Sequence, residues 1–180
     1  MKPELIISVI SLIISLASFL GAVVIFAISS RRENHQNLLQ RVSVFYSPEI
    51  HMANQRLWNL YREYGEEGFL GKYIEIMNKE NQDANALPIA ERMEFQRGTL
   101  HYQRRVVSSF WRGTAILIKY SLVPRNVVLK WWSRDDVEIV NKIIIPIEDR
   151  VADYLRVSRL NPKTDPLYYL VSIRHRFYKT

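Results

Sequence analysis

The sequence predicts an all-α protein: one N-terminal transmembrane helix followed by a small cytosolic helical bundle. Three observations lead to this fold class. A long uncharged apolar run stands near the N-terminus, apolar residues recur at helical spacing through most of the remaining chain, and no long alternating strand pattern appears. The chain has 180 residues, a net charge of +7 and no cysteine. It therefore has no disulfide or thiolate metal site, which fits a reducing compartment.

The uncharged run covers residues 5–28, after a short N-terminal end of residues 1–4. As a helix it would extend about 36 Å, whereas the hydrocarbon core of a bilayer is about 30 Å thick. A secretory signal peptide has a shorter apolar run and a small-residue cleavage site. Here Arg31 and Arg32 follow the run instead. We therefore predict a permanent single-pass anchor in the cell membrane.

The charges that flank this anchor predict its orientation. Arg31, Arg32 and Arg41 follow it, whereas Lys2 precedes it and is offset by Glu4. Basic residues favour the cytosolic side of a membrane. We expect the N-terminus outside and the C-terminal domain in the cytosol.

A stripe of small residues runs along one side of the predicted anchor. Its members alternate at spacings of three and four positions: Ser8, Ser11, Ser15, Ser18 and Ala22. Small residues let membrane helices approach closely, and serine hydroxyls bond across the contact. In the alternative interpretation, each hydroxyl bonds a carbonyl of its own helix and the spacing is chance. The first interpretation predicts a homo-oligomer or a membrane protein partner within the lipid bilayer.

The cytosolic part begins with a helical extension of the anchor over residues 29–46. Ser47 and Pro48 then form a strong start signal, an N-cap followed by proline at the first helical position. This second helix is expected to run to about Tyr64, because Gly65 is a natural stop.

A shorter helix is expected over residues 66–79, and the polar stretch 79–87 is expected to be a loop. Residues 88–120 then carry the longest helical pattern of the body. Gly98 and Gly113 lie inside it, and each costs about 1 kcal/mol relative to alanine. One of them is therefore expected to mark a bend or a close helix crossing.

The last part of the bundle domain, which spans residues 47–155, is expected to hold two more helices. Pro124 starts a short one that ends near Trp132, and Ser133 caps the next. Pro146 should kink that helix, because proline lacks an amide donor and crowds a preceding carbonyl.

The C-terminal segment 156–180 is basic and aromatic, and includes a helical candidate over residues 166–178. It holds six Lys and Arg residues against one Asp, a net charge of +5. With the arginines after the anchor, it supplies the candidate residues for binding a membrane surface or a partner: Arg31, Arg32, Arg174, Arg176, Tyr178 and Lys179. Anionic lipid attracts such residues, and single-stranded nucleic acid binds similar ones. Because the domain is tethered, we favour lipid or a partner protein over nucleic acid.

No catalytic pattern stands out. The four histidines lack metal-site spacing, and neither a phosphate-binding loop nor a nucleophile elbow occurs. Arg104, Arg105 and Arg112 form either a basic edge or the flank of a buried helix. We predict no cofactor, no metal and no enzymatic activity. An enzyme would need a cavity that joins His101, Arg105 or Glu63 from distant positions.

The chain resembles a family of bacterial single-pass membrane proteins with a cytosolic helical domain of unknown function. The resemblance covers residues 5–155 and is carried by the anchor with Arg31-Arg32, then by Arg56–Tyr61 (RLWNLY), Val106–Trp111 (VVSSFW), Tyr120–Val123 and Trp131-Trp132. It implies the fold and a location in the bacterial inner membrane, and it implies no activity.

Three functions follow, in order of preference. The first is a membrane-tethered interaction or scaffold domain, either an accessory subunit of a membrane complex or a self-associating anchor. The alternative is a membrane-localised nucleic-acid-binding protein that uses the basic C-terminal segment. The third is an enzyme without a recognisable motif.

Overall fold

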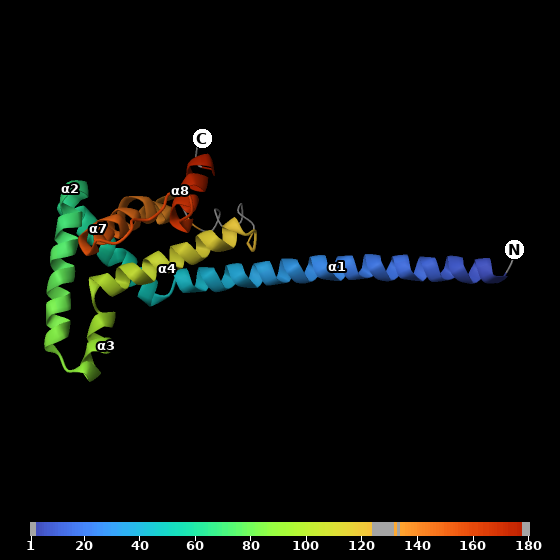
Figure 1. Ribbon diagram of the computed structural model, residues 1–180, viewed down its shortest axis with the longest axis horizontal. Helices are drawn as coiled ribbons and strands as arrows, with labels where there is room; N and C mark the ends of the chain where they lie inside the picture. Colours follow the sequence, from blue (N-terminus) through green and yellow to red (C-terminus); the bar gives the residue numbers. More distant parts are fainter. Residues whose placement is uncertain (1–2, 124–131, 133, 178–180) are drawn as a thin grey trace.

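The computed structural model describes residues 3–123, 132 and 134–177, and these ranges contain helices but no strand, which confirms the all-α prediction. A long helix projects from a compact group of shorter ones (Figure 1). The first two-thirds of the chain form α1 (Pro3–Phe45), α2 (Pro48–Ala86), α3 (Ile89–Arg97) and α4 (Leu100–Lys119). The C-terminal part forms α6 (Arg134–Ile139), the π-helical turn η1 (Val140–Ile144), α7 (Ile145–Leu155) and α8 (Pro166–Phe177).

Helix α1 is continuous over 43 residues, which confirms the helical extension predicted over residues 29–46. Its projecting part exposes large apolar side chains, with Phe19 67 % and Phe26 75 % exposed. Among the residues that the structure describes, no helix combines the length and the apolar character that a membrane span needs. The transmembrane assignment of residues 5–28 therefore stays a prediction from the sequence.

Helix α2 begins as the sequence predicts. The Ser47 hydroxyl accepts a hydrogen bond from the Ile50 amide at 3.5 Å, and Pro48 occupies the first turn. This cap satisfies one of the amide groups that the first turn of a helix leaves without a partner.

Gly65 kinks α2 and does not end it. Its φ of 68° and ψ of 176° interrupt the helical backbone, and the chain then resumes the helix as far as Ala86. The loop predicted over residues 79–87 was therefore wrong. The reason is that Met77 and Ala84 are buried, so packing holds a polar stretch in helical form.

The single helix predicted over residues 88–120 was also wrong, because α3 ends at Gly98 and α4 begins after Thr99. Two acceptors stabilise this new start. The Thr99 hydroxyl accepts from the Tyr102 amide at 3.1 Å, and a Glu80 carboxylate oxygen accepts from the Leu100 amide at 2.8 Å. The bend expected at a glycine therefore occurs at Gly98.

Gly113 leaves room for a side chain of α1. The Arg41 guanidinium of α1 lies over it, so that a Cβ atom at position 113 would be 2.5 Å from Nη2 of Arg41. Burial of this guanidinium lowers the pKa of Arg41. An alanine at position 113 would require the Arg41 guanidinium to shift.

A cluster of four aromatic rings joins the end of α1 to the bundle. The Phe45 ring lies 5.4 Å from Phe110, 5.7 Å from Trp111 and 5.9 Å from Trp132, measured between ring centroids. All four side chains are buried, and most of the ring pairs meet edge to face. Each such pair contributes about 1 kcal/mol beyond the apolar area that it buries. We call these residues the four-ring cluster.

The irregularity expected at Pro146 takes the form of the π-helical turn η1. The Ile145 amide donates to the carbonyl of Val140, five residues earlier. A wider turn accommodates the proline ring next to it, since Pro146 has no amide to continue the regular ladder. The helix predicted from Pro124 and the cap predicted at Ser133 lie outside the described residues.

Helix α8 packs against α4 and belongs to the bundle. Its apolar face buries Leu167, Leu170 and Ile173 in the common core. The Tyr168 hydroxyl donates to Asp149 Oδ2 of α7 at 3.2 Å. The part of the basic C-terminal segment that the structure describes therefore contributes side chains to the core of the bundle.

We predict opposite effects of alanine at two glycines of α2. Gly65→Ala should lower the free energy of unfolding by about 1–3 kcal/mol, because the backbone at residue 65 favours glycine. Gly71→Ala should raise it by about 0.5–1 kcal/mol, because Gly71 is exposed and has open space for a Cβ. Urea unfolding of both variants in one detergent measures the two changes. Equal changes at the two positions would contradict the kink.

Candidate interaction groove

The residues predicted for membrane packing all lie on α1. Helix α1 contains the stripe Ser8, Ser11, Ser15, Ser18 and Ala22, whose side chains are outside the described set. The members of the stripe therefore lie on one continuous helix.

The residues predicted for membrane-surface or partner binding that the structure describes belong to two helices, α1 and α8. Arg31 and Arg32 lie on the projecting part of α1, where Arg32 is exposed. Arg174 and Arg176 lie on α8, with side chains outside the described set, and 178–180, which include Tyr178 and Lys179, are outside the described residues.

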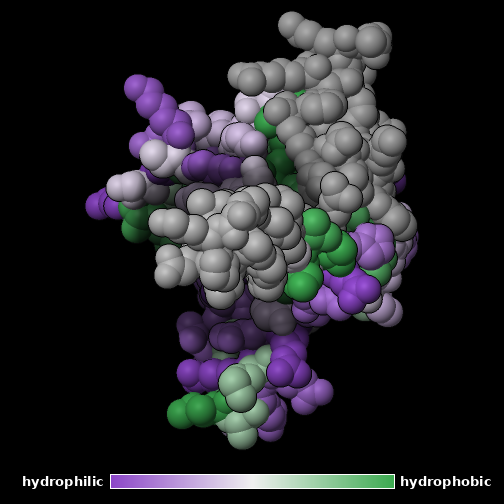
Figure 2. All heavy atoms as spheres, turned by 90° about the vertical axis from the view of Figure 1, so that its right-hand side faces the viewer, coloured by the Kyte–Doolittle hydropathy of each residue, from purple (hydrophilic) through white to green (hydrophobic). Residues whose placement is uncertain are grey.

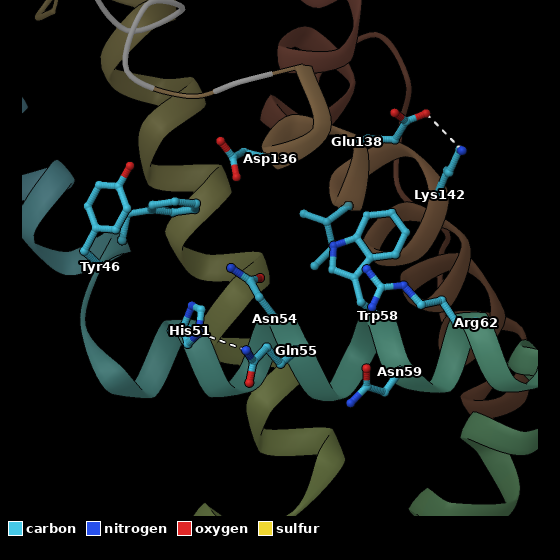
Figure 3. A pocket seen from close by; sticks show the side chains of 12 residues that line it. Tyr46, His51, Asn54, Gln55, Trp58, Asn59, Arg62, Asp136, Glu138 and Lys142 are labelled. Carbon is cyan, nitrogen blue, oxygen red and sulfur yellow. Dashed lines mark hydrogen bonds and ion pairs between the residues drawn. The ribbon is translucent and has the colours of Figure 1, made fainter.

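A groove with a volume of about 750 Å³ opens on the described surface. It lies between the junction of α1 and α2 on one side and α6 with η1 on the other (Figure 3). We call it the interaction groove. Its principal lining residues are Tyr46, Asn54, Trp58, Arg62, Asp136 and Lys142.

The α2 wall of the interaction groove carries aromatic and amide groups. The Arg62 guanidinium lies 5.9 Å from the centre of the Trp58 ring, a cation–π arrangement. Gln55 Nε2 lies 2.9 Å from His51 Nε2, as Figure 3 marks. The buried Oδ1 atom of Asn54 has no hydrogen-bond partner within the described chain.

The opposite wall carries charges of both signs. Lys142 Nζ lies 3.1 Å from Glu138 Oε1, one helical turn away, and Asp136 lies nearby on the same wall (Figure 3). A groove with aromatic faces, amides and mixed charges suits a polypeptide, which offers backbone donors and acceptors as well as side chains. The described lining contains no serine, threonine or cysteine.

Sequence reasoning missed this groove because its walls are far apart in the chain. Residues 45–62 and 136–142 meet only through tertiary packing. The one available signal was the helical period of α2, which places Asn54, Trp58 and Arg62 one turn apart on the same side.

The arginines of α4 serve mainly as flanking groups of a buried helix. Arg104 is buried, and its Nη1 lies 2.5 Å from Glu148 Oε1 of α7. Arg112 Nη1 lies 3.4 Å from Asp165 Oδ2, whereas Arg105 is exposed. Two of the three side chains thus link α4 to C-terminal parts of the bundle.

His101 lies close to the ion pair of Arg104 and Glu148. Its Nδ1 is 3.4 Å from the Tyr73 hydroxyl. Burial, reinforced by Arg104 and Arg105, lowers the pKa of His101, and burial raises the pKa of Tyr73. Both groups are therefore neutral at pH 7, which suits a packed polar cluster.

The hollow that includes Arg105 does not join it to the other residues that the enzyme hypothesis required. The hollow beside Arg105 is lined by Ser108, Ser109 and three charged neighbours, and contains neither His101 nor Glu63. No group of three His, Asp or Glu side chains in the described ranges could hold a metal ion.

No family model, no curated protein and no solved structure matches this chain. The resemblance to bacterial single-pass membrane proteins therefore stays a prediction.

We predict that Glu148→Ala destabilises the fold strongly. It leaves the buried Arg104 guanidinium without its carboxylate, and removal of one partner of a buried pair costs about 3–5 kcal/mol. Asp153→Ala is the matched control, because Asp153 pairs with Arg159 on the exposed surface. Thermal unfolding should show a large decrease in the melting temperature of the Glu148 variant and almost no decrease for the Asp153 variant. Similar losses would mean that burial of the Arg104 pair is unimportant.

Proposed function

We propose that this protein is a membrane-tethered helical interaction domain, held in a bilayer by α1 and presenting the bundle to a partner. The observation that carries the proposal is the exposed apolar surface of the projecting helix. Phe19, Ile25 and Phe26 are each at least two-thirds exposed, next to an uncharged sequence that continues toward the N-terminus. Soluble monomers rarely expose contiguous apolar surfaces of this kind, so lipid or another apolar chain is the expected cover.

The flanking charges support one orientation of the tether. Arg31 and Arg32 follow the apolar run directly, and basic residues favour the cytosolic side. We propose a single-pass protein of the cell membrane with its N-terminus outside and its bundle in the cytosol.

The small-residue stripe supports association within the bilayer. Helices with serine and alanine on one side pack closely, and their hydroxyl groups can bond across the contact. The proposed partner is a second copy of α1 or a helix of another membrane protein. The interaction groove then provides a second contact in the cytosol, for a polypeptide segment of that partner.

Nucleic-acid binding by the C-terminal segment is less well supported. Tyr168 and Tyr169 are half-buried and pack against the core, and the Tyr168 hydroxyl is bonded to Asp149. Stacking on bases needs exposed rings. If nucleic acid were nevertheless the partner, the intact protein would bind RNA or DNA with an affinity that falls steeply as salt increases.

We predict that Ser11→Leu combined with Ser15→Leu disrupts association of the intact protein in mild detergent. The larger side chains would separate helices that approach through small residues. Native mass spectrometry and chemical cross-linking measure the loss of the oligomer or of a co-purifying partner. The control is Ile13→Phe combined with Leu20→Phe, on the opposite side of the helical period, which should leave association intact. A monomer without a partner, unaffected by the serine changes, would refute the proposed association.

A separate prediction concerns the interaction groove. Asn59→Arg adds length and charge at an exposed lining position and should reduce recovery of the co-purifying partner several-fold. Gln82→Arg makes the same kind of change at an exposed position of α2 outside the lining, and should leave recovery unchanged. Equal recovery with both variants would show that the partner binds elsewhere.

A further inference from the structure

We propose that the C-terminal end of α4 docks onto the lipid headgroups of the same bilayer that holds α1. The contacting residues are Lys119, Tyr120 and Leu122, which we call the α4 tip. This inference rests on the proposed membrane tether and adds a second, peripheral contact. It follows from the register of α4 against α1, from the chemistry of the α4 tip and from the way in which its backbone is fixed.

Helices α1 and α4 run in opposite directions where they meet. Phe45 meets Phe110 and Trp111, and Arg41 lies over Gly113, so α4 advances as α1 is followed back toward its N-terminus. Figure 1 shows the end of α4 pointing along α1 toward the N-terminal part of that helix. The α4 tip is therefore the end of α4 nearest to the apolar run.

The register gives the height of the α4 tip above the apolar run. Tyr120 lies seven residues beyond Gly113, which places it beside about residue 34 of α1 if both helices rise equally. From there to the end of the apolar run at Ile28 is about 9 Å of helix. The headgroup zone of one leaflet is roughly 5–8 Å thick, so a tyrosine side chain at this height reaches into it.

The side chains of the α4 tip have the composition that headgroups favour. Tyr120 is 67 % exposed and Leu122 is 45 % exposed, and Lys119 is exposed beside them. Tyrosine prefers the membrane interface, and a basic residue near an anionic leaflet is attracted to it. Arg32, exposed on the adjacent part of α1, adds positive charge at nearly the same height.

The backbone of the α4 tip is fixed, so these exposed residues are held in place. Ser121 adopts a left-handed conformation with φ of 58°, and the Leu122 amide donates to the Leu117 carbonyl at 2.9 Å. These are the features of a Schellman cap. The next residue, Val123, is buried. The chain is thus secured on both sides of the exposed turn.

The surface around α1 is compatible with this contact. Figure 2 views the molecule from the side toward which α1 points, and apart from the grey atoms it shows hydrophobic and strongly hydrophilic residues next to one another. A mixed surface of this kind suits the headgroup layer better than the hydrocarbon core.

The test uses the intact protein in vesicles of phosphatidylethanolamine and phosphatidylglycerol. Because the chain has no cysteine, single cysteines can be introduced and labelled with a fluorophore. Tyr120→Cys and Leu122→Cys report on the α4 tip, and Val24→Cys reports on the tether. Met93→Cys, which is 74 % exposed on α3, is the control for a surface remote from the bilayer. Nitroxide quenchers are placed at the lipid headgroup or on the acyl chain.

We expect headgroup nitroxide to quench both tip labels several times more than the Met93 label, and acyl-chain nitroxide to quench the Val24 label most. If the Val24 label is quenched but the tip labels behave as Met93 does, the docking inference is wrong while the tether stands. If the Val24 label is not quenched at all, the tether itself fails, and the docking inference fails with it. Circular dichroism of each labelled variant confirms that the bundle is folded.

Discussion

Contact among four aromatic rings determines how the long helix and the bundle are related. Phe45 is the last residue of α1, and the three rings around it come from α4 and from Trp132, far along the chain. Because edge-to-face pairs have preferred geometries, they define the direction in which α1 leaves the bundle. The contact of Arg41 with Gly113 and the position of the α4 tip relative to α1 follow from that direction. A different packing of Phe45 would move every surface that the bundle presents along α1.

A second constraint acts within the bundle, where two buried polar contacts join segments that are far apart in the sequence. Arg104 faces Glu148 between α4 and α7, and Glu80 caps the start of α4 from the far half of α2. Each contact joins segments that are distant in sequence, and each loses its compensation when one partner is removed. These contacts specify which helices are neighbours, whereas apolar packing alone tolerates many arrangements. They also explain the role of Arg104, one of the three arginines that the sequence alone would allow to form a basic edge.

The sequence predicted the parts of the fold that depend on local signals. The cap at Ser47 and Pro48, the helical class and the extension of α1 all follow from neighbouring residues. The boundaries at 79–87 and at Gly98 did not, because buried Met77 and Ala84 hold a polar segment helical, and Glu80 stabilises a new start twenty residues away. The interaction groove was missed for a related reason, since its two walls meet only after folding. The small-residue stripe could be predicted from the sequence because all of its members lie on one helix.

The wide turn before Pro146 has a consequence for how the bundle tolerates change. A π-helical turn adds one residue to a helical circuit, and it rotates everything that follows by about 100° relative to a regular helix. Helix α7 leaves η1 with Ile147 and Val151 buried and with Glu148 directed at Arg104. The loss of one residue from η1 would preserve composition and helical content yet turn the carboxylate away from its partner. The spacing between Val140 and Glu148 is therefore as important to this protein as the identity of the residues between them.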